Sequence, residues 1–61
     1  MSLRTSVGTN PDDTDERDEW PGCFGTVDET GALQIVNRDE DDTIDTIYLN
    51  GEWAFYEVYA K

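Results

Sequence analysis

The pair Asn50-Gly51 separates two segments rich in β-branched and aromatic residues, 43–49 and 52–59. Asn-Gly is the strongest short-range signal for a two-residue hairpin, because both residues tolerate the positive φ of a type I′ turn. We therefore expect the two segments to pair as antiparallel strands. A two-residue loop would place Tyr48 opposite Trp53, and this register fixes which side chains share a face.

Both faces of this predicted hairpin are partly apolar. One face would carry Ile44, Tyr48, Trp53, Phe55 and Tyr59, and the other Ile47, Leu49, Ala54, Tyr56 and Val58. A sheet with one solvated face alternates more cleanly between apolar and polar residues. We therefore expect the sheet to curl into a half-barrel, or to be covered by a second copy or by another protein.

A second hairpin is predicted just upstream, after a turn at Trp20-Pro21-Gly22. Residues 23–27 and 32–36 read as strands, and Asp28-Glu29-Thr30-Gly31 fits a type I turn followed by a glycine with positive φ. A charged connection, 37–42, leads from this hairpin to the next one. The predicted fold of residues 20–61 is thus all-β, a small four-stranded antiparallel meander of two hairpins, as a half-barrel or a dimeric sheet.

Residues 1–19 have a different composition. Leu3 and Val7 are their only sizeable aliphatic side chains, and residues 12–19 are almost continuously charged. No helical or strand period can be read in this segment. We predict a disordered acidic tail over residues 1–19, followed by the β domain over 20–61.

The chain carries 15 acidic and four basic residues, for a net charge of −11. Phosphate contacts require Lys and Arg, so this balance argues against direct binding of nucleic acid and against an anionic membrane surface. Strong acidity fits either disorder or a folded protein kept soluble in concentrated salt. The seven aromatic residues favour the folded alternative for most of the chain.

The acidic excess, the single lysine and the preference for Asp over Glu resemble the small acidic proteins of haloarchaea. This resemblance covers the composition of the whole chain and implies a halophilic cytoplasm. Cys23 is the only cysteine, so no internal disulfide can form, and a free thiol fits a reducing compartment. The first eleven residues contain no apolar segment, so we expect no signal peptide. No apolar run approaches the length of a membrane helix.

The residues available for catalysis are few. The chain has no His, and residues 20–61 contain no Ser, so Cys23 would have no imidazole base. We expect no enzyme, no catalytic residue and no cofactor. Trp20-Pro21-Gly22-Cys23-Phe24-Gly25 only partly matches a zinc knuckle, and a buried thiol explains it better. Residues 39–42 are all acidic and could attract cations, but we expect a solvated loop and no specific metal site.

Five aromatic residues form the candidate interface: Tyr48, Trp53, Phe55, Tyr56 and Tyr59. They can serve as core, or as anchors for a partner, since Tyr and Trp are favoured at interfaces. The first hypothesis for function is a non-enzymatic interaction or regulatory protein that acts as a homodimer or on another protein, through this face or an edge strand. One alternative is an acidic mimic of nucleic acid that blocks a basic protein. Another is a small-molecule or cation-binding module.

Overall fold

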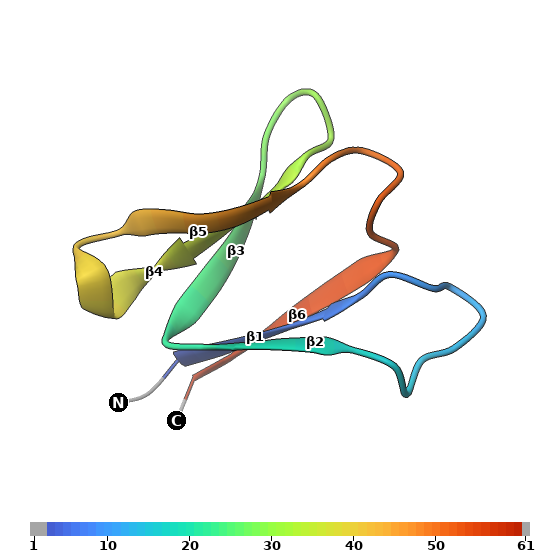
Figure 1. Ribbon diagram of the computed structural model, residues 1–61, viewed down its shortest axis with the longest axis horizontal. Coiled ribbons are helices and arrows are strands. Elements are labelled where there is room, and N and C mark those ends of the chain that lie inside the picture. Colours follow the sequence, from blue (N-terminus) through green and yellow to red (C-terminus); the bar gives the residue numbers. More distant parts are fainter. Residues whose placement is uncertain (1–2, 61) are drawn as a thin grey trace.

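The computed structural model describes residues 3–60, which form an all-β protein as predicted (Figure 1). In chain order the strands are β1 (Leu3–Gly8), β2 (Asp18–Pro21), β3 (Cys23–Val27), β4 (Leu33–Asn37), β5 (Thr43–Tyr48) and β6 (Phe55–Ala60). A short 3-10 helix, η1 (Arg38–Glu40), lies between β4 and β5. Within this part of the chain, no helix has both the length and the apolar character needed to cross a membrane.

The strands form two antiparallel sheets of three strands each. Sheet A has the order β2-β1-β6, and sheet B has the order β3-β4-β5. β1 is therefore the central strand of sheet A, and β4 that of sheet B. The predicted meander of four strands is wrong in this respect, because only β3, β4 and β5 follow one another within a single sheet.

Gly22 joins the two sheets at a sharp corner between β2 and β3 (Figure 1). Its N–H donates to the Leu3 carbonyl in sheet A at 2.7 Å, and its carbonyl accepts from the Arg38 N–H beside sheet B at 2.9 Å. Gly22 has a φ of +75°, and a Cβ there would lie 2.7 Å from the Asp39 carboxylate. Glycine avoids both the strain and the collision, so one continuous segment can serve both sheets.

The predicted hairpin over residues 23–36 is present as β3 and β4. The N–H of Gly31 donates to the Asp28 carbonyl at 3.1 Å, and the N–H of Asp28 donates to the Ala32 carbonyl at 3.0 Å. The Asp28 carboxylate also accepts from the backbone of Thr30 and Ala32. Gly31 has the expected positive φ, +86°. Local turn chemistry therefore determines this hairpin.

The predicted hairpin across Asn50-Gly51 is wrong. β5 pairs with β4, whereas β6 pairs with β1 in the other sheet. A turn does form, since the N–H of Glu52 donates to the Leu49 carbonyl at 2.8 Å. Only Gly51 has positive φ, however, which is the pattern of a type II turn and not of type I′. A type II turn splays the flanking strands, which is consistent with a chain that crosses to sheet A instead of folding back.

The predicted disordered tail is also wrong, because β1 lies within it. Thr5 and Val7 are fully buried, and the Thr5 hydroxyl donates to the Cys23 carbonyl at 2.7 Å. β1 pairs with β2 on one edge and with β6 on the other. Backbone hydrogen bonds on both edges therefore hold this strand in place although it has few apolar side chains. The charged residues 9–17 form an exposed connection between β1 and β2. Residues 1 and 2 of the predicted tail, and residue 61 of the predicted β domain, lie outside the described residues.

The core lies between the inner faces of the two sheets. Its buried members are Val7, Cys23, Leu33 and Ile35, and the half-buried aromatic residues Trp20, Tyr48, Trp53 and Tyr56 pack against them. Gly25 lets the Tyr56 ring lie directly on β3, since a Cβ there would come within 3.0 Å of the ring. The two sheets therefore cover each other's inner faces.

Candidate functional site

The structure does not bring the five candidate aromatic residues onto one surface. Tyr48, Trp53 and Tyr56 pack against the core. The Trp53 indole donates to the Gly31 carbonyl at 3.1 Å and meets the Tyr56 ring edge to face, with centroids 5.7 Å apart. These contacts fasten the connection between β5 and β6 to the tip of the β3–β4 hairpin, which is a structural role.

Tyr48 takes part in a short polar chain between the sheets. The Trp20 indole donates to the Tyr48 hydroxyl at 3.0 Å, and that hydroxyl donates to the Asp18 carboxylate at 2.8 Å. Burial is the main cause that raises the pKa of Tyr48, and the hydrogen bond to Asp18 adds to it. Tyr48 therefore keeps its proton and ties β5 to β2.

Phe55 and Tyr59 lie on the outer face of sheet A. The guanidinium of Arg17 stacks on the Phe55 ring, and that of Arg4 stacks on the Tyr59 ring, each 5.1 Å from the ring centroid. Glu57, between the two rings, accepts from the Tyr59 hydroxyl at 2.8 Å and from Arg17 at 2.9 Å. These two hydrogen bonds, the Tyr59 bond foremost, lower the pKa of Glu57. The polar groups of this face thus satisfy one another.

The outer face of sheet B carries a group of neighbouring apolar side chains, two of which are about half exposed. We call it the β5 apolar strip: Phe24, Val36, Ile44 and Ile47. Phe24, Val36 and Ile44 are neighbours across the three strands, and Ile47 lies further along β5, opposite Gln34. Ile44 is 53% exposed and Ile47 is 46% exposed. Both belong to the strand at the edge of the sheet.

A β-bulge places both isoleucines on one face. Residues three apart in a regular strand point to opposite faces, which is why the sequence-based register separated Ile44 from Ile47. Here Ile35 pairs with Thr46 but Val36 pairs with Ile44, so Asp45 is an extra residue. The Asp45 carboxylate is held by the Asn37 amide at 3.3 Å and the Cys23 thiol at 3.4 Å. Sequence reasoning missed this strip because no local pattern announces the bulge.

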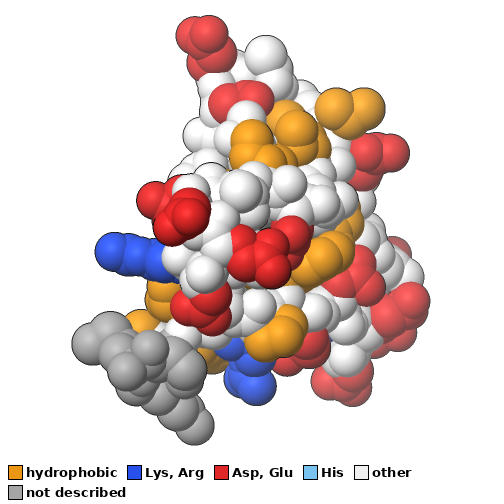
Figure 2. Space-filling model, turned by 60° about the vertical axis from the view of Figure 1, so that its left-hand side comes forward, with side chains coloured by type: hydrophobic (Ala, Val, Ile, Leu, Met, Phe, Trp, Pro, Cys, Tyr) orange, Lys and Arg blue, Asp and Glu red, His pale blue; other side chains and the backbone are white. Residues whose placement is uncertain are grey.

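The strip lies in an acidic part of the chain. Residues 28–52 hold eight acidic residues and one basic residue, Arg38, which gives 1 − 8 = −7. Figure 2 shows orange side chains scattered among red carboxylates on one face of the molecule, with few blue ones. An apolar strip on so acidic a segment favours a partner with the opposite charge.

The acidic loop 38–42 is arranged as a turn. The Asn37 carboxamide caps η1 by accepting from the Asp39 N–H at 3.0 Å. Asp41 and Asp42 both have left-handed φ values, 58° and 61°. Among residues 3–60, no group of three or more His, Cys, Asp or Glu side chains could hold a metal ion.

Cys23 is 1% exposed, and its thiol contacts the Pro21 carbonyl and the Asp45 carboxylate. Burial, reinforced by Asp45, raises the pKa of this thiol to about 11. A thiol in this environment stays protonated near neutral pH and is a poor nucleophile. Its role here is to fill the core and to hold Asp45 in the bulge.

Comparison of the chain with protein-family models, with curated proteins and with solved structures gives no match. The functional proposal below therefore rests on the chain's own residues.

Proposed function

We propose that this chain is a small non-enzymatic protein that binds another protein through the β5 apolar strip and the adjoining free edge of β5. The observation that carries the proposal is the pair Ile44 and Ile47, both about half exposed and turned to one face by the bulge at Asp45. A scattered apolar side chain on a surface needs no explanation, but a contiguous strip is typical of an interaction site.

The distribution of the aromatic residues supports this choice of surface over the one expected from sequence. Tyr48, Trp53 and Tyr56 are engaged in the core, and Phe55 and Tyr59 are covered in part by arginines. Docking at those rings would first break hydrogen bonds and stacking contacts that the folded chain already makes. Docking at Ile44 and Ile47 breaks nothing and removes apolar area from water.

The composition supports a working environment of concentrated salt in the cytoplasm of a halophilic organism. At 1 M salt, charges further apart than about 3 Å are largely screened, which relieves repulsion within a chain of net charge −11. Apolar contact is not weakened by such screening. The β5 apolar strip is therefore suited to binding at such salt, where only charges in close contact still attract one another appreciably.

Site-specific photo-crosslinking in native cell extract tests the proposal. A photoreactive residue would replace Ile47 in one variant, and Val58 in the matched control. Val58 is a similarly exposed apolar residue, 42%, but lies on β6 in the other sheet. We expect a discrete adduct at position 47 that is lost when Ile44→Thr is added, and none at position 58. Equal adducts at both positions, or none at position 47, would overturn the proposal.

A further inference from the structure

Resting on the proposed function, we infer the chemistry of the partner: an extended polypeptide segment, alternating apolar and basic residues, that adds to β5 as a fourth strand of sheet B. β5 pairs with β4 along one edge, and within residues 3–60 no strand pairs with its other edge. An edge strand of six residues presents unpaired backbone groups that another extended chain can use.

The outer face of β5 requires apolar side chains from such a segment. Alternate residues of an added strand would lie on the same face as Ile44 and Ile47, next to the β5 apolar strip. Val36, on the central strand, is already 93% covered, whereas Ile44 and Ile47, on the edge strand, are about half exposed. Apolar side chains of the added strand, next to Ile44 and Ile47, would extend the apolar layer across a fourth strand.

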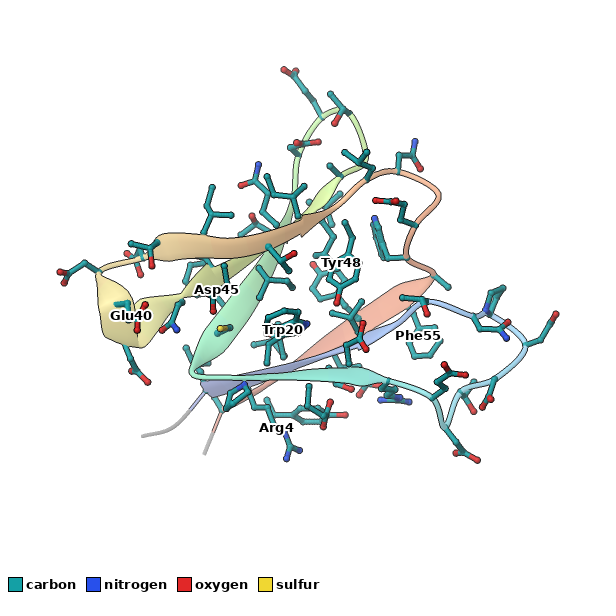
Figure 3. The ribbon with its side chains drawn as sticks, viewed as in Figure 1. Arg4, Trp20, Glu40, Asp45, Tyr48 and Phe55 are labelled. Atoms are coloured by element: carbon teal, nitrogen blue, oxygen red, sulfur yellow. The ribbon has the colours of Figure 1, made fainter. Side chains whose placement is uncertain are left out.

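The inner face of β5 requires basic side chains. Asp45 and Tyr48 both lie on the side of β5 that faces β2 (Figure 3). The Tyr48 hydroxyl holds the Asp18 carboxylate at 2.8 Å, so two carboxylates, those of Asp18 and Asp45, lie on that side. The remaining alternate residues of an added strand would point there. Lys or Arg would match these carboxylates, whereas an apolar residue would leave them without a counter-charge.

Charge also distinguishes this partner from a second copy of the chain. Pairing β5 with β5 of another copy would place two Asp45 carboxylates, and no basic side chain, on the paired strands. Like charges opposed across antiparallel strands are destabilising. A basic segment gains attraction from the same carboxylates, and the alternating pattern fixes which of its faces meets the strip.

The test uses full-length protein labelled for NMR and an acetylated eight-residue peptide that alternates Val and Lys. Three control peptides match it: one with Glu in place of Lys, one with the same residues in blocks, and one N-methylated at every internal backbone nitrogen. We expect saturable shifts of β5 amides with the alternating peptide only. Binding should be about tenfold weaker with Ile47→Thr and unchanged within about twofold with Val58→Thr.

The controls separate the possible outcomes. Equal binding of the N-methylated or block peptide would overturn strand addition, because binding would then need neither the backbone N–H groups nor the alternating order of side chains. Concentration-dependent shifts of β5 without peptide, with a dimeric mass, would overturn the inference in favour of a second copy. If no peptide binds while the position-47 adduct persists in extract, the inference fails and the proposed function stands. Loss of both results removes both.

Discussion

Val7→Ala tests whether the N-terminal segment is part of the core. The sequence placed Val7 in a disordered tail, but in the structure its side chain is 0% exposed. It packs with Cys23, Leu33 and Ile35 between the sheets. Removing two buried carbons costs about 1.6 kcal/mol at about 0.8 each. A residual cavity of about 50 Å³ adds about 1.2 kcal/mol at about 24 cal/mol per Å³. The expected loss in unfolding free energy is therefore about 2–3 kcal/mol.

A loss of this size is a large share of the stability of a 61-residue chain, which is about 3–9 kcal/mol at typical values per residue. It corresponds to a fall in Tm of about 10–20 °C. Denaturant unfolding followed by the fluorescence of Trp20 and Trp53 measures it, because both indoles pack against the core.

Val58→Ala is the matched control for this experiment. It removes the same two carbons from the neighbouring strand of the same sheet, but Val58 is 42% exposed. We expect a loss of about 1 kcal/mol or less, since part of the side chain is hydrated already and no closed cavity forms. Equal losses for the two variants, or a Val7→Ala loss below about 0.5 kcal/mol, would refute the placement of β1 in the core.

Four further outcomes are expected. Thr5→Val keeps the shape but leaves the Cys23 carbonyl without its 2.7 Å donor, so the unfolding free energy should fall by about 1–2 kcal/mol; an unchanged denaturation midpoint would contradict this. Folding lowers the carboxyl pKa of Glu57 from 4.5, so the stabilisation by its carboxylate is present above pH 4.5 and is lost as the pH falls through the lower folded value. The difference in unfolding free energy between the wild-type chain and Glu57→Gln should therefore shrink over that range. A constant difference would argue against the network. The Cys23 thiol, with a pKa of about 11, should react with a thiol reagent at pH 8 only as fast as the protein unfolds, and faster labelling would show an open site. Raising salt from 0.1 to 1 M should increase the denaturation midpoint of a chain with net charge −11, and a decrease would contradict the proposed environment.

The parts of the fold that could be predicted are those with local causes. The β3–β4 hairpin depends on Asp28 and Gly31, the first and last of the four consecutive residues that form its turn. The strand at 43–48 follows from its β-branched residues, and its pairing with β4 needs only the short connection through η1. In each case the residues that determine the structure are close in sequence.

The parts that could not be predicted depend on long-range pairing. β1 and β6 join nearly opposite ends of the chain, with Leu3 opposite Ala60. β1 forms a strand with few apolar residues because hydrogen bonds to both neighbouring strands hold it in place. The turn at Asn50-Gly51 then takes the form that lets the chain reach β1, and the N–H of Ala54 donates to the Gly8 carbonyl at 2.8 Å. Tertiary pairing decides between two turns that the same dipeptide allows.

The candidate site was missed for a related reason. At the bulge, Cys23 and Asn37, from two other strands, hold the Asp45 carboxylate. In a strand without a bulge, Ile44 and Ile47 would point to opposite faces. The apolar strip is therefore a property of three strands together and cannot be read from 43–48 alone.

Placing β1 in the core also changes what a partner has to do. A meander of residues 20–61 alone would leave the inner aromatic side chains uncovered, so a partner would be needed to complete the fold. With β1 and β6 in sheet A, the two sheets cover each other, and the radius of gyration of 11.2 Å is close to the roughly 10.5 Å expected for a folded chain of this length. Part of the apolar surface that remains, at Ile44 and Ile47, lies on the outer face of sheet B beside a free edge. A partner bound there would then add to a structure that is already complete, so its binding can be reversible without unfolding the chain.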